Sequence, residues 1–100
     1  MAYGYRAAFK VLQYYRTLYD CMTLRQFIQC LAPPVENDTD AYTKSVARSA
    51  DIRPDVLLPS PRKAKALWVK IVAGMHLVEN GMKPDVSQIE EGWELAFGRI

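Results

Sequence analysis

The sequence is short of the features that mark several common kinds of functional site. Only 5 of its 100 residues are glycine, and no glycine-rich turn joins a strand to a helix, which excludes a phosphate-binding loop. Its two cysteines, Cys21 and Cys30, lack the spacing of zinc ligands. Three aspartates, Asp51, Asp55 and Asp85, lack the spacing of a calcium loop. The sequence therefore predicts no metal and no cofactor.

Charge of one sign and long hydrophobic runs are missing too. The 13 basic and 11 acidic residues leave a net charge of +2, too small to indicate binding to nucleic acid or to an anionic membrane. The apolar runs fall far short of the roughly 20 residues of a membrane-spanning helix. The amino terminus lacks a signal peptide's order of charge, apolar stretch and cleavage site. We therefore expect no nucleic-acid partner, no membrane span, and cytoplasmic synthesis without a signal peptide.

The two cysteines are expected to be buried free thiols. A chain of 100 residues, half of them hydrophobic, can build one core without a disulfide, so free thiols are favoured over a bridge between Cys21 and Cys30. A cysteine nucleophile would need one of them to meet His76, and neither lies in a recognisable local signature. A thiol enzyme is therefore not indicated.

Helical periodicity fills most of the chain. No segment alternates apolar and polar residues over the length of a strand without also fitting a helical period. We therefore predict an all-α fold, a compact single domain over residues 1–100 with about five helices. The expected helices cover residues 4–20, 24–31 behind a Thr23 cap, 39–49, 61–80 and 86–97.

The fourth expected helix has the strongest apolar stripe and should be central. Ser60 is its expected cap, with Pro61 at the first helical position, where the missing N–H does no harm, and Gly81 ends it. Asp85 and Gln88 approximate a capping box for the fifth helix. The loop before the fourth helix is expected to bury an apolar clasp of four residues, Ile52, Val56, Leu57 and Leu58.

One stretch, Ala32–Tyr42, is less generic than the rest. Pro33 and Pro34 end the second helix and stiffen the connection, because proline lacks a backbone N–H and disfavours helical geometry in the residue before it. Residues 37–39, Asn-Asp-Thr, are all good cap types, so the third helix should begin among them. Glu36 lies between the prolines and this cap, and we expect its carboxylate to be carried on a constrained segment.

Glu79 is the one polar residue on the stripe of the fourth helix. It follows Met75 by four residues, which places it on the side of the core. Partial burial and the negative end of the helix dipole would both raise the pKa of its carboxyl, as a general acid requires. The alternative is a solvated carboxylate, or one paired with Lys83. His76, three residues earlier, can reach Glu79 along the helix surface.

Glu36 offers a second carboxylate. Glycoside cleavage uses two carboxyl groups flanking a cleft, one to protonate the leaving oxygen and one to activate water or to stabilise positive charge on the sugar. Glu36 and Glu79 have the chemistry for these two roles, and a separation of about 5 to 10 Å across a cleft would fit them.

Several short motifs are spread over almost the whole chain. They are Gly4-Tyr5-Arg6-Ala7, Thr23-Leu24 before Phe27-Ile28, Ala32-Pro33-Pro34 with Glu36-Asn37, Thr39 and Ala41-Tyr42, and Glu79-Asn80-Gly81. Together they resemble a known family, the bacteriophage and prophage virion structural proteins named after the muralytic structural protein of enveloped double-stranded RNA phages. Two positions depart from the family's pattern, because Leu31 stands where an aromatic residue often precedes Ala-Pro-Pro and Val78 where a histidine often precedes the second glutamate.

The resemblance implies a reduced lysozyme-like or transglycosylase-like fold, action on peptidoglycan or a related glycan polymer, and association with a virion and its other proteins. With it, we predict that Glu79 is the general acid and Glu36 the base or electrostatic stabiliser, while Asn37, Tyr42 and His76 line the glycan cleft. One alternative is a non-catalytic helical module of a phage particle that binds wall polymer or a partner protein. Another is an adaptor or regulator with an exposed tyrosine face.

Overall fold

Five α-helices and one short 3-10 helix make up the part of the chain that the structure describes. The structure, a computed structural model, describes residues 2–31 and 38–98, and no strand occurs among them. The prediction of an all-α fold with about five helices is confirmed. The elements are α1 (Ala2–Tyr19), α2 (Leu24–Leu31), α3 (Thr39–Ala50), η1 (Pro61–Lys63), α4 (Lys65–Asn80) and α5 (Val86–Phe97).

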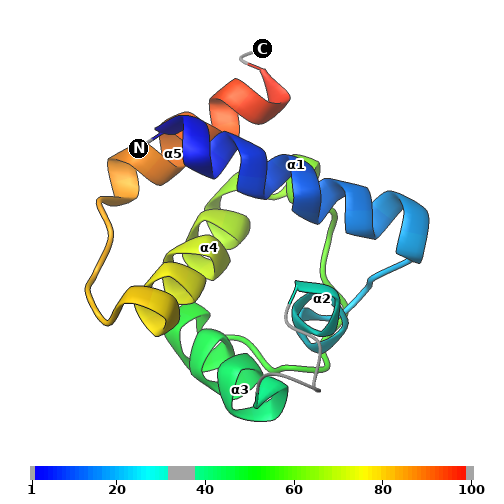
Figure 1. Cartoon of the computed structure of the whole chain (residues 1–100). Coiled ribbons are helices and arrows are strands. Elements are labelled where there is room, and N and C mark those ends of the chain that lie inside the picture. Colours follow the sequence, from blue (N-terminus) through cyan, green and yellow to red (C-terminus); the bar gives the residue numbers. More distant parts are fainter. Residues whose placement is uncertain (1, 32–37, 99–100) are drawn as a thin grey trace.

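The helices pack around α4. Helix α1 lies along α5, and α4 runs from this pair to α3, while α2 is seen end-on beside α4 (Figure 1). Trp68 and Ile71 of α4 are fully buried, and Phe27 of α2 meets the Trp68 ring edge-on at 4.8 Å between centroids. The predicted central helix is therefore central. Within the described ranges, no helix is both long enough and apolar enough to cross a membrane.

Side-chain caps fix where α2 and α3 begin. The backbone N–H of Gln26 donates to Thr23 Oγ1 at 3.3 Å, and Gln26 Oε1 accepts from the Thr23 N–H at 3.1 Å. This is a reciprocal capping box, so the Thr23 cap is confirmed. Asp38 caps α3 by accepting a hydrogen bond from the N–H of Ala41 at 3.1 Å. Asp38 is one of the three residues, 37–39, among which the third helix was expected to begin.

Helix α4 begins later than predicted. Ser60 makes no side-chain cap, the chain forms the short η1, and α4 starts at Lys65. The Pro61 carbonyl, which would accept from the Lys65 N–H in a continuous α-helix, instead accepts from the indole N–H of Trp93 at 2.9 Å. A hydrogen bond from Trp93 of α5 thus takes the place of the first hydrogen bond of the predicted helix. The end of α4 is as predicted, because Gly81 has φ 71° and its N–H donates to the Leu77 carbonyl.

The expected apolar clasp is only half formed. Leu58 is buried and Ile52 is half-buried, but Val56 and Leu57 are 43% and 70% exposed. The segment is extended there, with the Leu58 N–H donating to the Met22 carbonyl at 2.8 Å. Successive side chains of an extended chain point to opposite sides, so burying Leu58 turns Leu57 outward.

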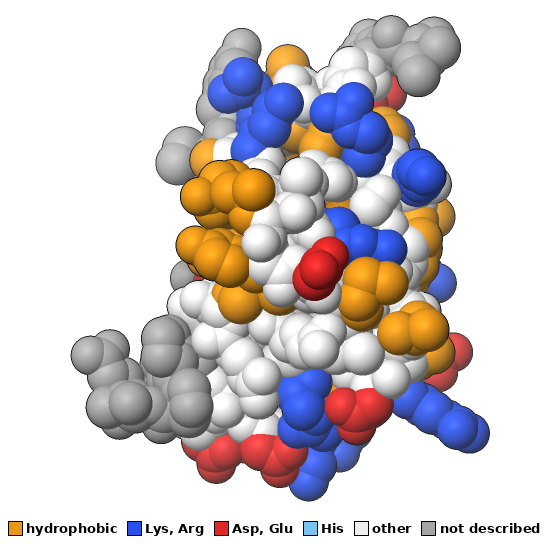
Figure 2. Space-filling model, turned by 90° about the vertical axis from the view of Figure 1, so that its right-hand side faces the viewer, with side chains coloured by type: hydrophobic (Ala, Val, Ile, Leu, Met, Phe, Trp, Pro, Cys, Tyr) orange, Lys and Arg blue, Asp and Glu red, His pale blue; other side chains and the backbone are white. Residues whose placement is uncertain are grey.

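One face of α1 is apolar and points to solvent. It consists of Ala7, Val11, Tyr14 and Leu18, and we call it the outer face of α1. Val11, Tyr14 and Leu18 are 40%, 51% and 59% exposed, whereas Phe9 on the opposite side of the helix is fully buried. Figure 2 views the molecule from the side of the carboxyl end of α1 and shows hydrophobic side chains at the surface there. The helix therefore has two apolar faces, of which the fold covers one.

Candidate functional site

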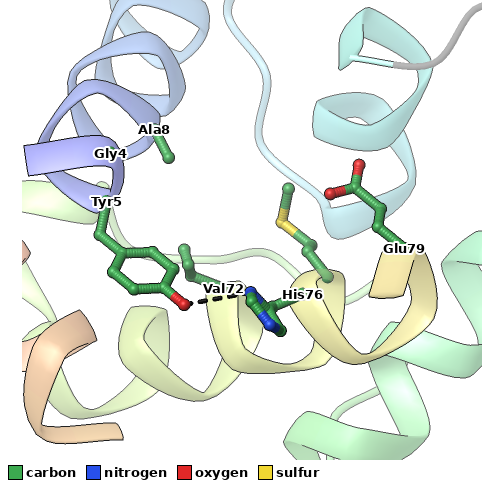
Figure 3. Close-up of a pocket in the computed structure, with 7 residues that line it drawn as sticks. Gly4, Tyr5, Ala8, Val72, His76 and Glu79 are labelled. Atoms are coloured by element: carbon green, nitrogen blue, oxygen red, sulfur yellow. Dashed lines mark hydrogen bonds between the residues drawn. The ribbon is translucent and has the colours of Figure 1, made fainter. Parts of the chain in front are cut away.

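A pocket of about 340 Å³ lies between the amino-terminal half of α1 and the carboxyl-terminal half of α4. Its walls are mostly apolar, with polar atoms from Tyr5, His76 and Glu79 (Figure 3). Apolar walls with a few polar groups are typical of ligand-binding pockets. The lining residues are Gly4, Tyr5, Ala8, Val72, Met75, His76 and Glu79.

Tyr5 and His76 join the two walls of this pocket. Their hydroxyl oxygen and Nδ1 are 3.0 Å apart, and the rings lie 6.0 Å apart between centroids. Partial burial, with Asp85 nearby, raises the pKa of Tyr5, so the phenol is protonated and can donate to Nδ1. His76 thus bonds to Tyr5, and not to Glu79 as the sequence suggested.

Glu79 stands at the rim of the pocket and is exposed. Of the two states that the sequence left open, partial burial and a solvated carboxylate, the solvated one is observed, because the apolar stripe of α4 reaches the surface in its last turn, where Val78 is 37% exposed as well. No ion pair with Lys83 or another cation occurs within the described parts of the chain. The Glu79 carboxylate instead accepts a hydrogen bond from the Tyr42 hydroxyl, with 3.2 Å between the oxygens.

Tyr42 brings this hydroxyl to Glu79 from α3, which packs against α4. The Tyr42 side chain is half-buried, and this burial, followed by the nearby Glu79 carboxylate, raises the pKa of its phenol. The phenol therefore keeps its proton and acts as a donor to Glu79. Two residues predicted to share a site do meet, and the contact holds the carboxylate in one orientation.

The other two predicted site residues, Glu36 and Asn37, lie outside the described residues. The pairing of Glu36 with Glu79 therefore stays a prediction. Among the parts of the chain that the structure describes, no group of three or more histidine, cysteine, aspartate or glutamate side chains could hold a metal ion.

Tyr5 lines the pocket with a polar group that sequence reasoning missed. The sequence includes it in the Gly4-Tyr5-Arg6-Ala7 motif but indicates no role for it in the site. A signal was present, because Gly4 and Ala8 flank it on α1 and both are small. Two small residues four apart leave space beside a helix, and an aromatic ring next to that space lines a hollow.

Comparison with known proteins points to phages. The chain is 29% identical over 99 residues to Protein P5 of Pseudoalteromonas phage PM2, a match that covers 95% of this chain and 57% of that protein. The chain thus spans a little over half the length of this relative. No protein-family model matches the chain, and no solved structure matches it. The chain is similar to a phage protein, as the motifs implied, while a muralytic or lysozyme-like family finds no support in these comparisons.

Proposed function

We propose that the chain is a phage-derived protein that acts on the glycan of peptidoglycan, with Glu79 as the proton donor. The observation that carries the proposal is the convergence of three predicted site residues at one end of α4. Tyr42, 37 residues before Glu79 in sequence, bonds to its carboxylate, and His76 lines the same pocket. The similarity to a phage protein is consistent with this source.

The pocket has groups suited to a sugar. The rings of Tyr5 and His76 offer flat surfaces against which the apolar face of a sugar can pack, and the Glu79 carboxyl stands where the polymer would cross the rim. In the reaction, Glu79 protonates the leaving glycosidic oxygen, and a second carboxylate stabilises the sugar cation or activates water. Glu36 is our candidate for the second group.

The test compares the turbidity of purified peptidoglycan, and the fragments released from it, for the wild type and for Glu79→Gln. We expect the wild type to clear the suspension and Glu79→Gln to lose this activity by at least about 100-fold, since proton donation contributes on that order. Glu90→Gln on the exposed side of α5 is the matched control and should stay active. If the wild type releases fragments from none of the walls tested, or if Glu79→Gln keeps full activity, the proposal is overturned.

The outer face of α1 favours a second candidate, a non-catalytic helical module of a phage particle. Ala7, Val11, Tyr14 and Leu18 are spaced four, three and four residues apart, as in the seam between paired helices. We propose that a second copy of the chain covers this face, because the four residues can meet the same four residues across a two-fold axis.

Charge favours an antiparallel arrangement of the two copies. Lys10 is exposed beside the outer face of α1, and a parallel pair would set the two Lys10 side chains next to each other. Antiparallel pairing separates them and also opposes the two helix dipoles. Four residues a side is far less than the roughly 20 to 30 of a standard interface, so this dimer would be weak.

A further inference from the structure

The structure brings the two cysteines of the chain together. Cys21 Sγ and Cys30 Sγ are 3.4 Å apart, while both remain free thiols. Cys21 is buried, as the sequence predicted, and Cys30 is half-buried. A disulfide has an S–S distance of about 2.05 Å, so the sulfurs must approach by little more than 1 Å. We propose that Cys21 and Cys30 are a disulfide-forming pair, oxidised by a small disulfide such as oxidised glutathione.

The local backbone holds the two thiols in place. After α1, Asp20 adopts left-handed geometry with φ 53°, and the Cys21 N–H donates to the Tyr15 carbonyl. The capping box at Thr23 fixes the start of α2, whose last turn carries Cys30. Since both backbones are anchored, rotation about the two Cα–Cβ bonds is the movement needed to bring the sulfurs together.

Access decides the order of the reaction. Cys30 is partly exposed, whereas Cys21 is 3% exposed, so the oxidant reaches Cys30 first. The Cys30 thiolate attacks the disulfide, forms a mixed disulfide and releases one glutathione thiolate. The Cys21 thiolate then attacks the Cys30 sulfur and releases the second. Two protein thiols are oxidised, one disulfide is reduced, and the two protons end on the released thiols.

The second step should depend on pH. The pKa of Cys21 is raised to about 11, chiefly by burial of the thiol. The hydrogen bond to Cys30 and the charges of Cys30 and Asp20 raise it further. Among the described residues, the phenol of Tyr15 on α1 also faces the pair, and its own pKa is raised chiefly by burial. At neutral pH few Cys21 thiols are ionised, so bridge formation should be slow there and faster in mild alkali.

The bridge would tie the end of α1 to the last turn of α2. It closes a loop from residue 21 to residue 30, which restricts the unfolded chain. Cys30 also precedes Glu36 by six residues, so oxidation would anchor the helix from which that segment departs. This inference does not depend on the proposed glycan chemistry.

The experiment incubates the folded chain with oxidised glutathione and follows the intact mass, the free thiols and the melting temperature. We expect loss of two hydrogen atoms and of both thiols in the monomer, and a Tm raised by on the order of 10 °C. The rate should rise about tenfold from pH 7.5 to pH 8.5, because the Cys21 thiolate fraction does.

Cys30→Ser is the control variant, and circular dichroism verifies that it folds. Under the same oxidant it should gain no internal bridge and no increase in Tm. Retention of both thiols in the wild type, a product that is only a glutathione adduct, or a disulfide only between two chains would each overturn the proposal. Should Cys30→Ser not fold, the reduced and oxidised forms of the wild type still provide the comparison.

Discussion

The Tyr42 hydroxyl donates a hydrogen bond to Glu79 Oε1 across 3.2 Å and so joins α3 to the last turn of α4. The donor is half-buried and the acceptor is exposed, which places the contact at the edge of the core. It links the stability of the fold to the orientation of the proposed acid, and both can be measured.

Tyr42→Phe removes this hydroxyl and keeps the ring. We expect the free energy of unfolding to fall by about 1 kcal/mol, the usual net value of one hydrogen bond, because Glu79 remains solvated when its donor is lost. Urea denaturation measures the change. Tyr14→Phe is the control, since Tyr14 is 51% exposed, and its stability should match the wild type. Equal stability of Tyr42→Phe and the wild type would contradict the contact.

Alkaline pH should destabilise the chain, and Tyr42 should contribute to this effect. The pKa of Tyr42 in the fold lies above its ordinary value of 10.0, so the folded chain holds this proton more tightly than the unfolded chain. The stability it provides is complete below pH 10 and is lost as the pH rises above 10. Urea midpoints across this range should fall less for Tyr42→Phe than for the wild type. Cys21, Tyr5 and Tyr15 shift in the same direction and leave a residual slope.

Two glycines give a matched pair of substitutions. Gly81 has φ 71°, and Gly81→Ala should lower stability by about 1 kcal/mol because an alanine is strained in left-handed geometry. Gly4 lies in α1 with nothing within 4 Å of an added Cβ, so Gly4→Ala should raise stability by about 0.5 kcal/mol. Thermal denaturation compares them, and a change of the same sign in both would contradict this explanation.

Local chemistry predicted the elements well, and contacts between elements account for what it missed. The Thr23 and Asp38 caps and the Gly81 stop depend on residues a few positions away, so the sequence contains them. The late start of α4 depends on Trp93, 32 residues beyond Pro61. No periodicity within the fourth helix could have indicated that bond.

In the candidate site, too, nearby residues predicted some features, and contacts between helices determined the others. The helical stripe placed Glu79 on the side of α4 that faces the core, but exposure of its last turn depends on how far the neighbouring helices extend. Tyr42 was included because it belongs to a motif, and its contact with Glu79 follows from the packing of α3 on α4. Tyr5 lines the pocket opposite His76, to which it is hydrogen-bonded and which lies 71 residues away in sequence.

The close approach of α3 and α4 at Gly74 predicts a destabilised variant. A Cβ added at Gly74 would lie 3.1 Å from the Ser49 Cβ and 3.4 Å from Val46 Cγ1. Gly74→Val should therefore lower stability by about 1–3 kcal/mol, as overpacking does. Ala66→Val on the exposed side of α4 is the control and should lose at most about 0.5 kcal/mol. Because valine is a better helix former than glycine, a Gly74→Val loss no larger than that of Ala66→Val in urea denaturation would contradict overpacking at position 74.

The last prediction concerns the outer face of α1. If a second copy covers this face, light scattering should show a mass that rises with protein concentration from monomer toward dimer, because the interface is small. Leu18→Asp places a charge at the end of the seam, where the antiparallel pair would set it against Ala7 of the second copy, and should keep the chain monomeric at every concentration tested. Met82→Asp is the matched control, since Met82 is 70% exposed and lies beyond α4, and it should associate as the wild type does. A wild type that stays monomeric at high concentration, or equal loss of association in both variants, would exclude self-pairing through α1. Normal wall cleavage by monomeric Leu18→Asp would further show that the two surfaces serve separate functions.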